Sequence, residues 1–231
     1  MKERLERLVE ERERVLGAFL EREQERLALC CHAMARSFAR GGTLLAYGVG
    51  PAATDAAHVA VEFVHPVIVG KRALPALGPP NDVIALMRPG DAALSLAHAA
   101  EEEAVRRFRE EARRRELLMI AMTGPGPSVD ADFHFSVESD DPQVVQEVQE
   151  TTYHVLWELV HVFFEHPGLL SEACITCGDV AVEARVVAVD NGTAVIEKDG
   201  ATEDVAADLV PGLVPGDRVL CHAGVVLEKL E

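Results

Sequence analysis

The 231-residue sequence is poor in basic residues, in aromatic residues and in long apolar runs. Lysine and arginine number 22 against 39 aspartates and glutamates, so the formal net charge is −17. Such an acidic surface repels phosphate backbones, which excludes nucleic acid as an expected partner; binding a small anion would need a local exception to that field. Hydrophobic residues still make up 48% of the chain, enough for a substantial core, so wholesale disorder is excluded as well.

No apolar run reaches the roughly 18–20 residues that a membrane-spanning helix needs, so no membrane association is expected. The first residues, Met1 to Arg4, open a charged amphipathic segment without the apolar centre of a signal peptide. The five cysteines are an odd number and lack the spacing of a disulfide framework. We therefore expect a cytoplasmic protein whose thiols are free or bind metal.

Helices and strands are expected to alternate over about the first 165 residues. Apolar residues recur at helical spacing up to Gly41-Gly42, which predicts one long helix over residues 2–40. Thr54 is a candidate cap for a second helix that runs to about residue 64. Further helices are expected at 101–116 and 142–165, and strands at 43–47, 83–87, 92–96, 117–122 and 133–137. This alternation is typical of a parallel sheet with helices on both faces.

The composition changes after His166-Pro167-Gly168, which ends the last long helix. From about residue 180 the chain is rich in valine, and Asn191-Gly192 and Asp199-Gly200 are strong hairpin signals. Strands are expected at 185–189, 193–198, 201–205, 218–222 and 225–230, which together suit a small β-barrel. The sequence thus predicts an α/β domain over residues 1–168 and a β-barrel domain over residues 174–231.

The segment from Gly48 to Phe63 resembles the signature of phosphoheptose isomerases. Those SIS-domain enzymes typically read Gly-Asn-Gly-Gly-Ser-Ala, followed by Asp, His and Glu in the order seen here at Asp55, His58 and Glu62. Two further stretches agree, Arg88 to Asp91 and the Gln-Glu-Val that opens the last long helix. The resemblance covers roughly residues 1–165 and implies an SIS-type parallel sheet flanked by helices.

Four side chains match the metal-binding and acid/base group of phosphoheptose isomerases. His58 and Glu62 are four apart on one helix, and Gln146 and His154 are eight apart on another, so each pair shares a helix face. The resemblance implies that the four bind a metal, with zinc as the expected ion, and that Glu62 and His154 move protons between adjacent sugar carbons. The alternative is that His58 and Glu62 form an ordinary solvated or hydrogen-bonded pair.

The phosphate-binding half of the resemblance is missing. Ala52 occupies the position after the glycine turn where such isomerases have a serine, and the expected Ser/Thr-rich loop reads Ala-His-Ala-Ala-Glu-Glu over residues 97–102. Methyl groups cannot donate hydrogen bonds, and the two carboxylates repel a phosphate. The sequence therefore predicts an SIS domain that has lost its usual phosphate site.

Residues 174–230 resemble the HypC/HupF hydrogenase-maturation chaperones. A cysteine pair, Cys174 and Cys177, precedes the expected barrel, and a late strand reads Val-Leu-Cys-His-Ala-Gly with His222 at its end. The resemblance implies that Cys177, or else Cys174, joins His222 in carrying an iron fragment with cyanide and carbonyl ligands. It also implies two partners, a scaffold protein of hydrogenase maturation and the immature large subunit of a [NiFe] hydrogenase.

Three other interpretations of these cysteines stay open. Family members usually place the cysteine directly after the initiator Met, whereas here both follow a whole domain. A zinc site of Cys174, Cys177, Cys221 and His222 has suitable ligands, but neighbouring strand residues point to opposite faces, which separates the last two. A redox dithiol is the second interpretation, although the pair does not open a helix in a thioredoxin-like setting. The third is that Cys221 is a small core residue, as are Cys30 and Cys31 on the first helix.

The first function predicted from the sequence is that of a non-enzymatic accessory factor for metallocentre assembly, with the SIS-like part as a scaffold. A metal-dependent sugar-phosphate isomerase and a sugar-phosphate sensor are the alternatives, and Ala52 argues against both. A homo-oligomer is expected through the apolar stripe of the long N-terminal helix, although that stripe also suits packing within one subunit.

Overall fold

The computed structural model spans residues 1–231 and describes all of them except 100–101, 167–169, 171–180, 199, 223 and 231. The chain divides into two compact units, Met1–His161 and Val162–Glu231, which are described separately. Among the described helices, none combines the length and apolar character that crossing a membrane would require.

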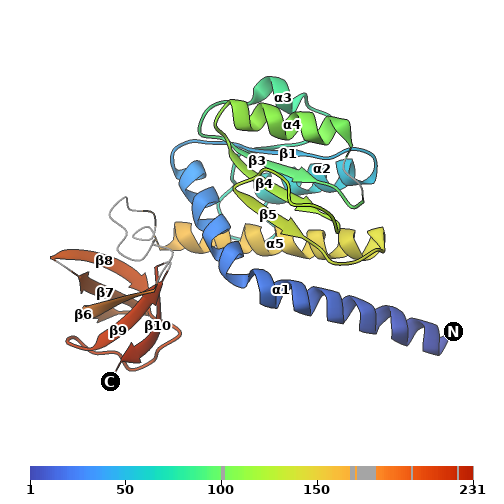
Figure 1. The fold of residues 1–231 in the computed structure, drawn as a ribbon. Coiled ribbons are helices and arrows are strands. Elements are labelled where there is room, and N and C mark those ends of the chain that lie inside the picture. Colours follow the sequence, from blue (N-terminus) through green and yellow to red (C-terminus); the bar gives the residue numbers. More distant parts are fainter. Residues whose placement is uncertain (100–101, 167–169, 171–180, 199, 223, 231) are drawn as a thin grey trace. The chain divides into compact units, whose positions relative to one another are not determined.

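The first unit is built on a five-stranded parallel sheet (Figure 1). The strands are β1 (Leu44–Tyr47), β2 (Ala76–Leu77), β3 (Ala92–Leu96), β4 (Leu118–Thr123) and β5 (Phe133–Ser136), in the spatial order β2-β1-β3-β4-β5. Every residue of the central strand β3 is buried, as expected for a parallel strand that is covered on both faces. The predicted SIS-type fold class is thereby confirmed.

Five helices accompany this sheet: α1 (Lys2–Ala39), α2 (Pro51–Val64), α3 (Val83–Leu86), α4 (Glu103–Arg114) and α5 (Pro142–Glu165). The helices α3 and α4 cover one face, where Phe108 packs in one cluster with Leu45, Ala93 and Met119 of the sheet. Figure 1 shows α1 and α5 on the other face. Residues 2–10 of α1 are all exposed, and buried residues begin at Val15. The predicted homo-oligomer stays a prediction.

Two local predictions for the first unit were wrong. Residues 83–87 do not form a strand: Asp82 accepts a hydrogen bond from the Ala85 amide at 3.3 Å and caps the short helix α3 instead. A short apolar run has no periodicity long enough to distinguish the two states. The helix α2 begins at Pro51 rather than near Thr54, because proline suits the first helical position; the Thr54 hydroxyl donates to the Pro51 carbonyl.

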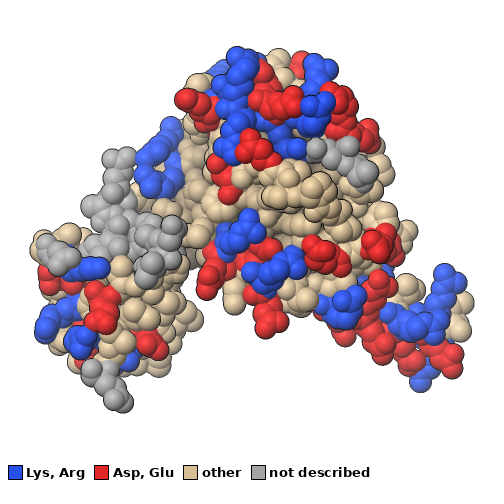
Figure 2. Space-filling model, in the orientation of Figure 1, with Lys and Arg blue, Asp and Glu red and all other residues tan. Residues whose placement is uncertain are grey.

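Four arginines in α4 and directly after it are tied to carboxylates. Figure 2 shows blue and red side chains interleaved there rather than separated into patches. The ion pairs join Arg106 to Glu103 and Glu110, Arg113 to Asp130 and Asp132, and both Arg114 and Arg115 to Glu111. These arginines are therefore neutralised locally, which leaves the acidic excess of the chain unopposed.

The strands of the second unit form a closed barrel in the order β10-β8-β7-β6-β9. They are β6 (Val182–Asp190), β7 (Thr193–Lys198), β8 (Ala201–Ala206), β9 (Arg218–His222) and β10 (Val225–Leu230). Asn191 and Gly192 have φ values of 44° and 82° in the turn between β6 and β7, as the hairpin signal predicts. Small and branched residues such as Ala194, Ile196, Val205 and Val219 fill the interior.

Candidate functional site

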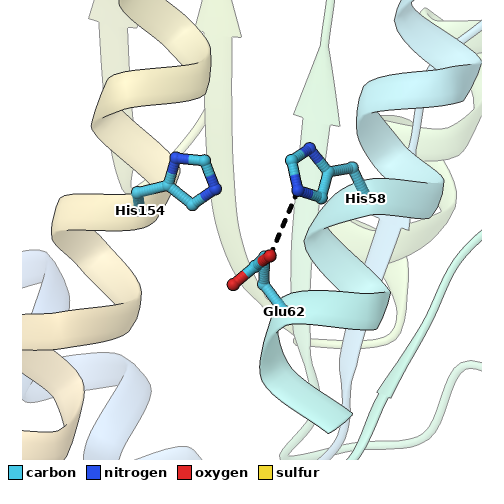
Figure 3. Close-up of side chains that lie close together, drawn as sticks. All are labelled: His58, Glu62 and His154. Atoms are coloured by element: carbon cyan, nitrogen blue, oxygen red, sulfur yellow. Dashed lines mark hydrogen bonds and ion pairs between the residues drawn. The ribbon is translucent and has the colours of Figure 1, made fainter. Parts of the chain in front are cut away.

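The helices α2 and α5 bring three of the predicted site residues together. His58, Glu62 and His154 each offer one ligand atom, and these atoms all lie within 4.8 Å of one another. His58 Nε2 is 3.2 Å from Glu62 Oε1, and Figure 3 shows His154 reaching toward this pair from the opposite helix. Two imidazoles and a carboxylate at this spacing are a donor set that zinc accepts.

His58 is also held from its other ring nitrogen by two residues of α5 that the sequence analysis did not single out. The Tyr153 hydroxyl lies 2.9 Å from His58 Nδ1, and a Glu150 oxygen lies 3.8 Å from the same atom. Tyr153 is fully buried, and this burial raises its pKa above the ordinary value, so the hydroxyl stays protonated. Helix geometry accounts for Glu150, which lies one turn before both Tyr153 and His154, whereas Tyr153 is adjacent to His154 and no spacing rule singles it out.

The fourth predicted ligand, Gln146, contacts a different carboxylate. Its amide nitrogen donates to Asp55 Oδ1 at 3.1 Å. The other oxygen of Asp55 is 2.6 Å from His98 Nε2, an ion-pair distance without hydrogen-bond alignment. Both Asp55 and His98 are buried. The Asp55–His98 contact was not predicted from the sequence, because it joins a residue near the start of α2 to the loop after β3. The predicted role of Gln146 as a metal ligand stays a prediction.

A cavity of about 360 Å³ lies beyond the carboxyl ends of β1 and β3. It is lined mainly by apolar residues: Val49, Pro51, Ala52, Leu96, Ala97, Ala99, Val105 and Pro142. Four polar residues complete the lining: His98, Glu102, Gln143 and Gln146. The structure thus gathers in one cavity the alanines that stand where the family resemblance leads one to expect hydroxyl groups.

The barrel separates Cys221 from His222, as strand alternation predicts. Cys221 is buried in the core, and burial, followed by the nearby charge of Glu203, raises the pKa of its thiol to about 11. His222 is partly exposed, and its Nδ1 is buried with no hydrogen-bond partner in the described part of the chain. The two other predicted ligands, Cys174 and Cys177, lie outside the described residues.

Comparison with known proteins identifies relatives for the first unit. The chain is 32% identical to a phosphoheptose isomerase of Desulfovibrio desulfuricans over 60% of its own length and 77% of the relative's. It is 30% identical to that of Aquifex aeolicus, covering 69% of this chain and 96% of the relative. A solved phosphoheptose isomerase from Neisseria gonorrhoeae matches the fold with a TM-score of 0.60 at 22% identity, covering 69% of this chain and 97% of that one.

The second unit matches a different family. The model of the HupF/HypC family matches residues 180–231, which contain all five strands of the barrel and His222. The two similarities lie in separate parts of the chain. The chain therefore belongs to the phosphoheptose isomerase family in its N-terminal part and carries a HupF/HypC family domain at its C-terminal end.

Proposed function

We propose that this protein is an accessory chaperone of metallocentre assembly that carries an iron fragment for a [NiFe] hydrogenase. The match of residues 180–231 to the HupF/HypC family carries the proposal. In this role the barrel would bind the iron fragment, with its cyanide and carbonyl ligands, and pass it on. The expected partners are a maturation scaffold protein and the precursor of the hydrogenase large subunit.

The state of His222 supports this role. His222 is partly exposed, its buried Nδ1 has no hydrogen-bond partner among the described residues, and neutral imidazole is a good ligand for iron. Burying a polar atom without a hydrogen bond costs free energy, so an unpaired nitrogen in a native structure calls for an explanation. Iron binding by His222 is such an explanation.

The described cysteines narrow the choice of thiolate. Cys30, Cys31 and Cys221 are all buried, and burial raises the thiol pKa of each. A thiolate is the form that binds a soft metal, so these three are poor ligands. This leaves Cys174 and Cys177, and the family resemblance favours Cys177, which lies nearer the barrel in the sequence, with Cys174 as the second choice.

Anaerobic purification with metal analysis tests the proposal. The full-length chain is co-expressed with hydrogenase-maturation proteins, and iron content and co-purifying partners are measured. We expect iron in the wild type, strong loss in His222→Ala, and strong loss in Cys177→Ala or Cys174→Ala. The matched control Cys30→Ala should keep its iron, since Cys30 is a buried thiol of the other unit. Iron-free wild-type protein without maturation partners would overturn the proposal.

A second candidate function is favoured by the group of His58, Glu62 and His154. The relatives of the first unit are phosphoheptose isomerases, and these residues keep the acid/base pair that the resemblance assigns. Tetrahedral zinc with bonds of about 2.1 Å holds its ligands roughly 3.4 Å apart. The ligand atoms of the group lie within 4.8 Å of one another, so a pair would have to approach by at most about 1.4 Å to reach that spacing.

In this second role the chain's own residues would divide the work. His58, Glu62 and His154 would hold the ion, with the Gln146 oxygen as the fourth donor. Zinc, when bound, polarises a carbonyl group. The Glu62 oxygen that is not bound to the ion would take a proton from one carbon, and the His154 ring nitrogen that is not bound to the ion would exchange a proton at the neighbouring position.

Incubation with sedoheptulose 7-phosphate separates the two functions. Turnover that disappears in Glu62→Gln would establish the isomerase and demote the scaffold role of the first unit. We expect no turnover, because Ala52, Ala97 and Ala99 give the cavity methyl groups where a phosphate needs donors. The iron measurements on the barrel are independent of this result.

A further inference from the structure

The cavity beyond β1 and β3 offers hydrogen-bond acceptors from three of its four polar residues. Glu102 contributes a carboxylate, and its Oε1 faces the turn at Gly50, 4.0 Å from where a Cβ on that glycine would lie. His98 has Nε2 against Asp55, so a proton is favoured on Nε2 and Nδ1 remains as an acceptor. Gln146 directs its amide nitrogen to Asp55, which leaves its oxygen. A ligand that matches these groups must bring donors.

The helix starts around the cavity have lost most of their own donors. Pro51 and Pro142 are the first residues of α2 and α5, and proline has no N–H. The amides of Ala52 and Ala53 are turned to the carbonyls of Val49 and Gly50, each at 3.2 Å. The starts of α2 and α5 are therefore poor anion sites, although a helix N-terminus usually favours anions, and the third start at the cavity, that of α4, has the carboxylate residue Glu102 as its N-cap.

The start of α5 is also neutralised by a carboxylate. The Gln143 amide donates to Asp141 Oδ1 at 2.9 Å, so an acidic side chain already occupies the place that a ligand anion would take. None of the described residues that line the cavity is lysine or arginine. Glu102 is thus the one carboxylate among the described lining residues, and no lysine or arginine among them opposes it.

The apolar lining residues of the cavity indicate what the remainder of the ligand, apart from its donor group, should be. Eight of the twelve lining residues are apolar, and three of these are alanines, which leave room for an apolar body. A polyol would need hydrogen-bond partners for many hydroxyl groups. The described lining has only four polar residues, and two of them, His98 and Gln146, already use one side-chain atom on Asp55. An ammonium group has three N–H donors and a positive charge, which suit Glu102, His98 and the Gln146 oxygen.

We propose that this cavity binds a small organic cation, a primary amine on an apolar body, with Glu102 as counter-ion and His98 Nδ1 as a second acceptor. The site is distinct in chemistry from a sugar-phosphate site and does not depend on iron binding by the barrel. The SIS domain would then bind an amine in this cavity rather than a phosphorylated sugar.

Three probes with one apolar body test the proposal on the full-length chain: 2-phenylethylamine, 2-phenylethanol and 2-phenylethyl phosphate. Binding is measured by calorimetry or ligand-observed NMR at about 150 mM salt, which screens the general acidic surface. We expect the amine to bind about tenfold tighter than the alcohol, because a charge-assisted hydrogen bond replaces a neutral one. The phosphate should bind more weakly than either.

A pair of neighbouring variants assigns the binding to the cavity. Glu102→Gln removes the proposed counter-ion and should raise the Kd of the amine at least fivefold while leaving that of the alcohol unchanged. Glu103→Gln removes an equal charge one residue away, on an exposed side chain that pairs with Arg106 outside the cavity. The Glu103→Gln variant should bind the amine and the alcohol with the Kd values of the wild type. Equal effects of the two variants, or a phosphate that binds as tightly as the amine, would overturn the proposal.

Discussion

The Tyr153 hydroxyl and His58 Nδ1 lie 2.9 Å apart and join the buried side of α5 to the metal-ligand candidate on α2. If Nε2 of His58 binds a metal, Nδ1 must carry the ring proton and can donate it to the tyrosine oxygen. A partner on the second nitrogen fixes the ring orientation of a metal-binding histidine. Tyr153 is thus placed as a positioning residue for His58.

The variant Tyr153→Phe should weaken zinc binding about tenfold, the lower end of the effect of such supporting partners. The measurement is a competition between the protein and a chromophoric chelator, which needs no enzymatic activity. Tyr47→Phe is the matched control, because Tyr47 stacks on Phe108 away from the histidines and is the only other tyrosine. Equal zinc affinity in Tyr153→Phe and wild type would remove the positioning role.

Cys221 should resist alkylation in the native protein. Burial raises the pKa of its thiol to about 11, so at pH 8 only about one thiol in a thousand is ionised, and the thiolate is the reactive form. Iodoacetamide followed by peptide mass spectrometry should leave Cys221 unmodified in the folded chain and modify it in denaturant. Rapid native labelling at Cys221 would show that the barrel interior opens, and that this residue belongs among the candidate iron ligands.

The sequence predicted the parts of the site that depend on helix geometry. Residues four or eight apart on a helix share a face, so His58 with Glu62 and Gln146 with His154 could be paired before the fold was known. The family resemblance then placed the two helices together, which periodicity alone does not do.

Contacts between segments that are distant in the sequence could not be predicted. The Asp55–His98 contact joins a helix start to a loop after a different strand, and no spacing rule connects residues 43 positions apart. The strand β2 has only two residues and leaves no alternating pattern, whereas the run at 83–86 is apolar but becomes a helix because Asp82 caps it. Short elements are decided by caps and neighbours rather than by their own residues.

His134 should make the first unit less stable in mild acid. Burial, together with the charges of Arg26 and Arg109, lowers its pKa below the ordinary 6.5, while the nearby carboxylate of Glu23 opposes this shift. Between the lowered pKa of the folded state and pH 6.5, His134 is therefore protonated in the unfolded chain and neutral in the folded chain. Stability from this residue is complete above pH 6.5 and is lost as the pH falls from 6.5 through the lowered pKa of the folded state.

Urea unfolding at pH 7.5, 6.5 and 5.5 tests the role of His134, with the fluorescence of Trp157 as the probe. Trp157 is the single tryptophan and is buried in α5, so it reports on this helix of the first unit. His134→Gln keeps a polar group near the Thr123 hydroxyl, which lies 2.9 Å from the ring in the wild type. The free energy of unfolding should fall more steeply with acid in the wild type than in the variant, and parallel slopes would contradict the assignment.

Gly192→Ala should destabilise the barrel more than Gly200→Ala does. Both glycines have a positive φ, 82° and 85°, where an L-residue with a Cβ is strained by roughly 1–2 kcal/mol. At Gly192 a Cβ would also lie 2.3 Å from Asp208 Oδ1, whereas at Gly200 nothing lies within 4 Å. Because strain is common to both variants, the difference between them isolates the clash with Asp208. Hydrogen exchange of the β6 and β7 amides in the full chain measures the barrel directly, and the Gly192 variant should exchange faster. Equal exchange in the two variants would mean that Asp208 moves aside at no cost, so that the close approach at this turn does not help to hold the barrel that carries His222.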